Sequence, residues 1–210
     1  MSTKLPRRLT QLAVGLVAYG ISIGLLVRAN LGLDSWDVLH QGIAQRLGVS
    51  IGWVVNGVGV LVLLAWIPLR QRPGVGTVAN VVVVGLVADA TLAVLPALSS
   101  LPVRVLTLTV AIALNALATG LYVGAGLGPG PRDGLMTGLA ARGHSIRVVR
   151  TVIEVSVLGA GWLLGGTVGV GTLLYAVSIG PLVQLLLPPL TVHIDQTAPR
   201  VSKRGTPCAA

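Results

Sequence analysis

Long apolar stretches, separated by short charged segments, set the pattern of this chain. Six windows of mainly apolar residues lie near 9–27, 51–69, 77–96, 104–125, 147–165 and 171–188. A helix of ~20 residues, rising about 1.5 Å per residue, crosses the ~30 Å hydrocarbon core of a bilayer. The pattern therefore predicts six transmembrane helices.

Two shorter segments, 34–48 and 130–143, carry charges and are too short to span a membrane. In the first, Leu39, Ile43 and Leu47 fall at i, i+4 and i+8, which places them on one face of a helix. We expect two short amphipathic helices, which lie in the membrane interface or re-enter the membrane while packed against protein.

The chain contains an internal repeat. Residues 31–42 recur as 127–138 at an offset of 96, and residues 74–77 recur as 169–172 at an offset of 95, which indicates a single deletion near Val49. Glycine, aspartate and threonine matches carry the repeat, because apolar matches are common in so valine-rich a chain. These matches pair Gly32 with Gly128, Asp37 with Asp133, Gly42 with Gly138, Gly76 with Gly171 and Thr77 with Thr172.

Each half of the chain contributes three spans, so the second copy is expected to cross the membrane in the opposite sense to the first. The expected fold class is all-α: a polytopic membrane bundle of six transmembrane helices in two inverted three-helix repeats, each with a short amphipathic or re-entrant helix. We expect a cytoplasmic N-terminal tail at 1–8, repeat 1 at 9–97, repeat 2 at 98–188 and a disordered cytoplasmic C-terminal tail at 189–210. Counting the short segments as spans would make the repeats parallel, but it would also cancel most of the charge bias described next.

Composition and charge agree with a membrane protein and orient it. The chain is 53% hydrophobic and 10% charged, with a mean hydropathy of +0.87, which is too apolar for an ordinary soluble domain. With both termini in the cytoplasm, only Arg28, Arg46 and Arg104 of the 15 Lys and Arg residues fall outside. The net charge of +9 is then explained by membrane lipids as partners, because basic residues face anionic headgroups, and no nucleic acid is expected.

Two acidic residues are predicted at membrane depth, where a carboxylate costs about 2.5 kcal/mol or more and normally faces a pathway. Asp89 lies 12 residues beyond Thr77, or about 18 Å along its helix, near the bilayer midplane. Glu154 can pair with Arg150 at i, i+4, so a structural role is equally expected for it. The predicted substrate or proton pathway comprises Asp89, its repeat counterpart Gln184, Glu154, Asn80 and Asn56.

The repeated acids have a structural and a functional interpretation. Asp37 and Asp133 fall in the first turn of the short helices, where a carboxylate satisfies free backbone N–H groups. Alternatively, the two short helices approach the membrane centre from opposite faces, as broken helices do in inverted-repeat transporters. Because a resident carboxylate occupies the field of each helix N-terminus, the expected cargo is a cation or a proton-coupled neutral solute.

Other chemistry is not indicated by the sequence. It has no HExxH, GxSxG or paired-carboxylate motif, so we expect no enzymatic activity. His40 and His144 belong to no metal-ligand cluster, and the glycine-rich run 165–172 lacks the lysine of a phosphate loop. We therefore expect neither a metal nor another cofactor.

Three segments resemble the YczE/YyaS/YitT family of bacterial integral membrane proteins. They are residues 31–39 (LGLDSWDVL), residues 127–135 (LGPGPRDGL) and the repeated Gly-Val-Gly-Thr, and the resemblance extends over residues 10–188, closest to the YczE branch. This chain has Ser35 where the family motif has Pro, and Arg132 where it has Trp. The resemblance implies a bacterial plasma-membrane protein but no particular substrate.

Two functions remain open from the sequence. The first is a small inverted-repeat permease or exporter, with its site between the halves near Asp89 and alternating access by rocking of the repeats. The second is a non-transporting scaffold or regulatory subunit, whose small-residue faces, Gly20-x-x-x-Gly24 and Gly120-x-x-x-Gly124, bind partner helices or a second copy of the chain.

Overall fold

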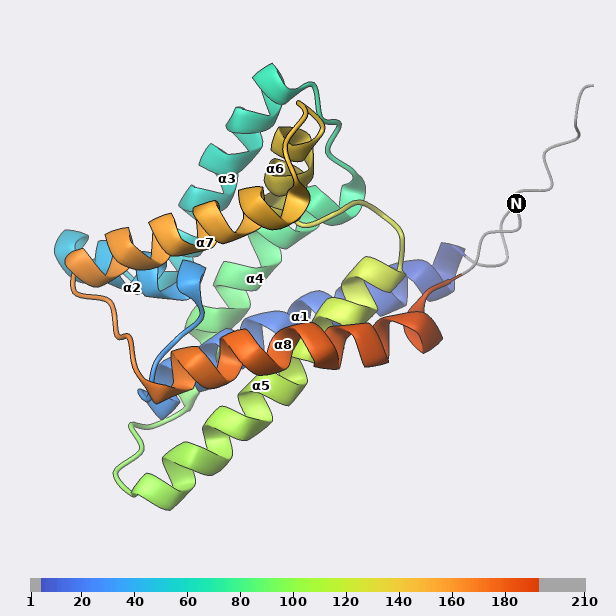
Figure 1. The fold of residues 1–210 in the computed structure, drawn as a ribbon. Coiled ribbons are helices and arrows are strands. Elements are labelled where there is room, and N and C mark those ends of the chain that lie inside the picture. Colours follow the sequence, from blue (N-terminus) through green and yellow to red (C-terminus); the bar gives the residue numbers. More distant parts are fainter. Residues whose placement is uncertain (1–4, 193–210) are drawn as a thin grey trace, which may run out of the picture.

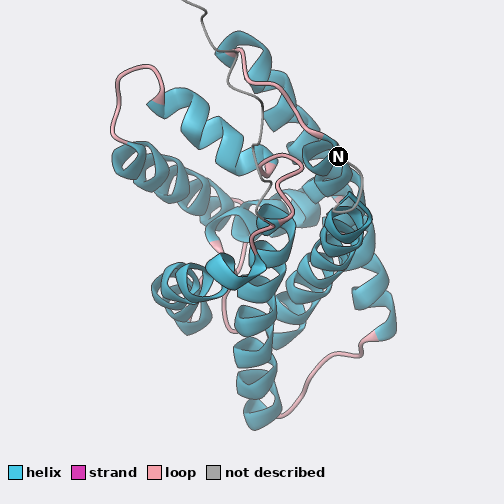
Figure 2. Cartoon of the chain, turned by 90° about the vertical axis from the view of Figure 1, so that its right-hand side faces the viewer, coloured by secondary structure: helices cyan, strands magenta, loops and turns pink. Residues whose placement is uncertain are grey.

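The computed structural model describes residues 5–192, and their regular structure consists of eight helices (Figures 1 and 2). The six long helices are α1 (Leu5–Ala29), α3 (Ile51–Leu69), α4 (Val75–Val94), α5 (Leu101–Gly124), α7 (Ile146–Leu163) and α8 (Val170–Leu190). The two short helices are α2 (Ser35–Leu47) and α6 (Pro131–Ala140). All eight lie where the hydrophobic pattern predicts helices, which confirms the all-α fold class.

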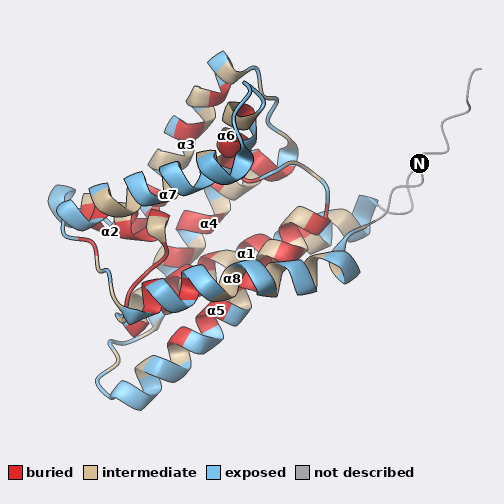
Figure 3. Ribbon diagram, viewed as in Figure 1, coloured by how far each residue is buried: buried red, intermediate tan, exposed pale blue. Residues whose placement is uncertain are grey.

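Five of the long helices have the length and hydropathy of membrane spans: α1, α3, α4, α5 and α8. Helix α7 has 18 residues, but its charged residues Arg147, Arg150 and Glu154 set it apart from these five. The long helices carry exposed large apolar residues, among them Leu61 and Leu106. Figure 3 shows that exposed residues recur along these helices. The chain is therefore a multi-pass membrane protein with five candidate spans among its described residues.

Both ends of the helical region extend beyond the predicted bounds. Helix α1 begins at Leu5, within the predicted tail 1–8, because Arg8 donates a hydrogen bond from Nε to the carbonyl oxygen of Ala125 at 2.7 Å. Helix α8 ends at Leu190, whose carbonyl oxygen accepts from Gln11 Nε2 at 2.6 Å. The rest of the predicted C-terminal tail, 193–210, lies outside the described residues.

Helices α1 and α5 pack along each other in opposite directions at the centre of the molecule (Figure 1). Arg8, near the start of α1, binds Ala125 just after the end of α5, as described above. Its repeat counterpart Arg104, near the start of α5, donates from Nε to the carbonyl oxygen of Ala29, the last residue of α1, at 2.8 Å. The two contacts are equivalent under the 96-residue offset, so each half anchors its first long helix on the other half.

The repeated glycine motifs form a second pair of equivalent contacts between the halves. The backbone N–H of Gly76 donates to the carbonyl oxygen of Leu127 at 2.9 Å. The N–H of Gly171 donates to Leu31 at 2.8 Å in the same way. The Leu-Gly turn of each half therefore docks onto the Gly-Val-Gly-Thr turn of the other, and this interlock explains why both motifs recur.

Gly32 and Gly128 make the interlock possible. Their φ angles are +119° and +129°, a region that side chains rarely adopt. A Cβ atom would also lie 2.7 Å from Thr172 Oγ1 at the first position and 2.6 Å from Thr77 Oγ1 at the second. The repeated Gly and Thr residues are thus explained by close contact between backbones.

The small-residue faces of α1 and α5 are covered within the chain. At Gly20, a Cβ atom would lie 2.6 Å from Val87 of α4, and at Gly120 it would lie 2.9 Å from Leu190 of α8. Gly42 similarly allows α2 to approach the backbone of α7, and Gly138 allows α6 to approach the end of α3. The short helix of each half therefore packs on a long helix of the other half.

Candidate functional site

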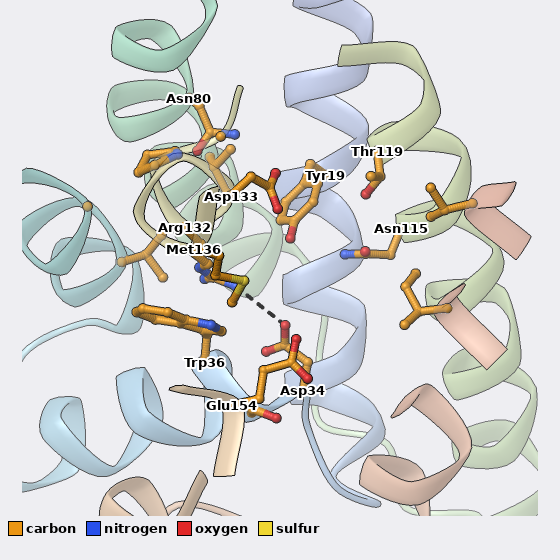
Figure 4. Close-up of a pocket in the computed structure, with 18 of the residues that line it drawn as sticks. Tyr19, Asp34, Trp36, Asn80, Asn115, Thr119, Arg132, Asp133, Met136 and Glu154 are labelled. Atoms are coloured by element: carbon orange, nitrogen blue, oxygen red, sulfur yellow. Dashed lines mark hydrogen bonds and ion pairs between the residues drawn. The ribbon is translucent and has the colours of Figure 1, made fainter. Parts of the chain in front are cut away.

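A cavity of about 560 Å³ lies between the two halves, and all eight helices contribute to its lining. Polar and aromatic side chains face it from both halves (Figure 4). All three tyrosines of the chain, Tyr19, Tyr122 and Tyr175, line it. A cavity of this size and mixed character suits a small organic molecule.

The N-termini of α2 and α6 meet at this cavity. Asp34 caps α2, because its Oδ1 accepts a hydrogen bond from the backbone N–H of Asp37 at 2.6 Å. Arg132, in the first turn of α6, lies 3.4 Å from Asp34 Oδ2 and 3.6 Å from Asp37 Oδ1 (Figure 4). Its guanidinium also lies over the ring of Trp36, 5.0 Å from the centroid. Arg132 of the second half thus forms ion-pair contacts with both Asp34 and Asp37 of the first half.

Burial shapes the protonation of this cluster. Burial and the neighbouring Asp37 raise the pKa of Asp34 to about 7, although Arg132 opposes the shift. Burial also raises the pKa of Asp37. It lowers the pKa of His40 to about 3, so His40, whose Nδ1 lies 3.1 Å from Asp37 Oδ1, is neutral. Burial thus makes the Asp34 carboxyl group easier to protonate than a carboxyl group in water.

Asp133 has different surroundings from its repeat counterpart Asp37. It is exposed to the cavity, whereas Asp37 is 2% exposed. Its Oδ2 accepts a hydrogen bond from the hydroxyl of Tyr122 at 3.0 Å. The ring of Tyr122 in turn meets Tyr19 edge-on, with 5.9 Å between centroids.

A chain of hydrogen bonds joins three long helices beside the cavity. Asn115 Nδ2 donates to Ser22 Oγ at 2.8 Å, and the hydroxyl of Tyr175 donates to Asn115 Oδ1 at 2.8 Å. These residues come from α5, α1 and α8 and are buried. The side chains of Asn115, Ser22 and Tyr175 are all hydrogen-bonded in this network, so the network fixes one wall of the cavity.

Three of the five predicted pathway residues line the cavity: Glu154, Asn80 and Gln184. Glu154 makes the predicted i, i+4 pair, since its Oε1 accepts from Arg150 Nε at 2.8 Å. The side chains of Arg150 and Glu154 are 59% and 37% exposed, so this part of the lining is open.

Asp89 and Asn56 do not line the cavity. Asp89 lies in the last two turns of α4, where its Oδ1 accepts from the N–H of Gly52 at 2.8 Å and its Oδ2 from Ser50 Oγ. It therefore caps the first turn of α3 from outside that helix, and the structure does not bring it together with the pathway residues that line the cavity. Asn56 also joins α3 to α4, because its Oδ1 accepts from the N–H of Gly85 at 3.1 Å.

Sequence reasoning missed the central residues of the site. Asp34 is the first residue of the predicted segment 34–48 and directly precedes α2, and its position as a helix cap is the pattern that could have found it. Arg132 stood out only as a departure from the family motif, although it is the repeat counterpart of Trp36, which it contacts. The pairing of α2 with α6 brings these residues together, and no local pattern encodes that pairing.

The sequence matches a family of unknown function (DUF6198) over residues 6–188. It is 33% identical over 192 residues to "Uncharacterized membrane protein YczE" of Bacillus subtilis, covering 90% of this chain and 89% of that protein. It is 44% identical over 169 residues to an uncharacterized protein of Haemophilus influenzae, covering 80% and 78%. It is 25% identical to "Uncharacterized protein YyaS" of B. subtilis, covering 86% and 92%. No solved structure matches the chain.

Proposed function

The chain belongs to this family of YczE-like membrane proteins, as the motif resemblance indicated, and from that premise we propose that it is a small-solute permease. It is a transporter of the bacterial plasma membrane rather than an enzyme, and the solute binds in the cavity between the two repeats. The observation that carries the proposal is a difference between two helix–helix seams, α3–α4 and α7–α8, which are equivalent positions in the internal repeat.

The first seam is closed. We call it the α3–α4 seam, and its residues are Gly52, Asn56, Gly85 and Asp89. Helices α3 and α4 pack closely there, joined by the hydrogen bonds of Asp89 and Asn56. The backbones approach so closely that a Cβ atom at Gly85 would overlap both Asn56 and the carbonyl oxygen of Gly52.

The second seam is open. We call it the α7–α8 seam, and its residues, the repeat counterparts of the first set, are Arg147, Thr151, Gly180 and Gln184. Helices α7 and α8 are not packed against each other (Figure 1). A Cβ atom at Gly180 would meet nothing within 4 Å. Both helices nevertheless line the cavity, so the cavity extends to this seam.

Unequal seams in equivalent repeats are what alternating access requires. In the alternative state of the permease, the α7–α8 seam closes and the α3–α4 seam opens. The charge bias of the sequence favours an orientation in which Gln184, in the α7–α8 seam, lies toward the cytoplasm and its counterpart Asp89 lies toward the outside. The conformation described here is then the cytoplasm-open state.

The permease has six spans in two inverted repeats, with α7 as the sixth. Its 18 residues extend about 27 Å, close to the thickness of the hydrocarbon core. Its charged pair Arg150 and Glu154 faces the cavity, while Val148 and Val155 are exposed on its surface and face lipid. Helices α2 and α6 are re-entrant, because their N-termini meet at the cavity rather than at opposite membrane surfaces.

The cargo is a cation or a proton-coupled solute. Asp34, Asp37 and Asp133 occupy the helix N-termini, which would otherwise favour an anion. Asp34 supplies a proton-exchanging group, and the indole N–H of Trp36 supplies a hydrogen-bond donor. That N–H is buried and has no acceptor among the described residues. The scaffold alternative is less favoured, because it needs the glycine faces of α1 and α5 to be free for a partner. In this structure α4 and α8 cover those faces.

Gly180→Val is expected to abolish transport without disturbing the structure. The Cβ atom of the added side chain meets nothing within 4 Å in the open α7–α8 seam, but the side chain would prevent that seam from closing as tightly as its counterpart. Currents from proteoliposomes on a solid-supported membrane, evoked by mixed metabolite pools and pH jumps, should fall at least about tenfold.

The matched control is Gly57→Val. Gly57 is an exposed helical glycine of α3, away from the cavity, and a Cβ atom at this position also meets nothing within 4 Å. This variant should retain the wild-type current. Absence of any current in folded wild-type protein, or equal currents in both variants, would count against the permease.

A further inference from the structure

The carboxylates of the cavity differ in their partners. Three of them line it: Asp34, Asp133 and Glu154. Asp34 has the guanidinium of Arg132 at 3.4 Å, and Glu154 has that of Arg150 at 2.8 Å. Within residues 5–192, Asp133 has no cationic side chain in ion-pair contact, and its one hydrogen-bond donor is the Tyr122 hydroxyl.

The internal repeat explains this difference. Asp37 and Asp133 are equivalent third residues of α2 and α6. Arg132 of the second half reaches Asp37 at 3.6 Å, but the residue of the first half equivalent to Arg132 is Trp36. The first half therefore supplies an uncharged indole where the second half supplies a guanidinium. One acid of the pair thus has a cationic partner from the other half, and the other has none among the described residues.

The surroundings of Asp133 favour an organic cation. In Figure 4 its carboxylate lies beside Tyr19 at the cavity. The rings of Tyr19 and Tyr122 meet edge-on next to it, with 5.9 Å between centroids. An ammonium or guanidinium group gains from both a carboxylate and aromatic ring faces. Arg132 shows the same combination in the other half, because its guanidinium contacts Asp37 and the ring of Trp36.

An inorganic divalent cation fits the site less well. Such ions require several oxygen or nitrogen ligands held together. Among the described residues, no group of three His, Cys, Asp or Glu side chains is placed to hold a metal ion. The cavity of about 560 Å³ also has room for an organic body beyond the charged group.

We infer that Asp133, with Tyr19 and Tyr122, binds the ammonium or guanidinium group of an organic cation. This inference deepens the proposed permease, on which it rests for the transport of that cation. Asp133 pairs with the charge, the tyrosine rings pack against it, and the Tyr122 hydroxyl holds the carboxylate in place.

Isothermal titration calorimetry on the purified protein in nanodiscs tests the inference without a transport assay. The probes are methylguanidinium and tetramethylammonium, with sodium and acetate as comparison ions. We expect saturable binding of an organic cation to the wild type and a loss of at least about tenfold in affinity in Asp133→Asn. Tyr122→Phe retains the ring and loses the hydroxyl, so it should weaken binding less.

Glu154→Gln is the matched control. It removes the same charge from the same cavity, but Glu154 is already paired with Arg150, so the affinity should fall clearly less than in Asp133→Asn. Size-exclusion chromatography and circular dichroism verify that each variant is folded. No saturable binding of either organic cation, or an equal loss in Asp133→Asn and Glu154→Gln, would overturn the inference.

The binding and transport experiments can fail separately. Organic-cation binding that depends on Asp133, in a protein that carries no current, would support this site and contradict the permease. Currents that persist unchanged in Asp133→Asn and are not inhibited by either organic cation would support the permease and overturn this site.

Discussion

Gly85→Ala is expected to force α3 and α4 apart and to destabilise the protein strongly. A Cβ atom at this position overlaps the carbonyl oxygen of Gly52, which is backbone and cannot rotate away, as well as the side chain of Asn56. Overpacking of this kind costs about 1–3 kcal/mol, and loss of the Asn56 hydrogen bond adds about 1 kcal/mol. The free energy of unfolding in detergent micelles should therefore fall by about 3 kcal/mol.

Gly180→Ala provides the control at the equivalent position of the second half. Its Cβ atom meets nothing within 4 Å, so only the higher helix propensity of alanine remains, which stabilises by about 0.5–1 kcal/mol. The same substitution at equivalent sites should thus have opposite effects on unfolding. Equal effects would mean that the two seams do not differ in packing.

Arg132→Leu is expected to cost about 3–5 kcal/mol, because it leaves Asp34 and Asp37 buried without their common cation. Chemical unfolding in micelles measures the loss. The loss should shrink in acid: burial already raises the pKa of both carboxyl groups, and the protonated acids need no cation. Adding Asp37→Asn to Arg132→Leu should recover part of the stability.

Arg150→Leu is the matched control for this prediction. It removes an arginine from the same cavity, but Arg150 is 59% exposed and its pair with Glu154 is solvated, so little stability should be lost. Similar losses in Arg132→Leu and Arg150→Leu would show that the contacts among Arg132, Asp34 and Asp37 do not hold α2 and α6 together.

The sequence predicted those features that local patterns encode. The apolar windows located the helices, and i, i+4 spacing identified the pair of Arg150 and Glu154. The recurring Gly and Thr residues marked the segments at which the two halves interlock. In each case, the evidence lies within one helix or within the repeat itself.

The site depends on contacts between distant elements, which local patterns do not contain. The position of Asp89 was predicted by counting residues from the start of its own helix. Its carboxylate instead accepts a hydrogen bond from the N-terminus of another helix, α3. Arg132 joins acids that lie about a hundred positions earlier in the chain. Its role became visible only when the folded chain brought the N-termini of α2 and α6 together.

Transport by this permease requires that the two seams open in turn. Spin labels at exposed and repeat-equivalent valines, Val60 with Val82 and Val155 with Val177, report on the α3–α4 and α7–α8 seams respectively. The single cysteine, Cys208, would first be replaced by serine.

Double electron–electron resonance in nanodiscs, with and without an organic cation, measures both label distances. Alternating access predicts two label distances across each seam. The population with the short α7–α8 distance should increase as the population with the short α3–α4 distance decreases. A single, unchanged distance across both seams under all conditions would contradict it.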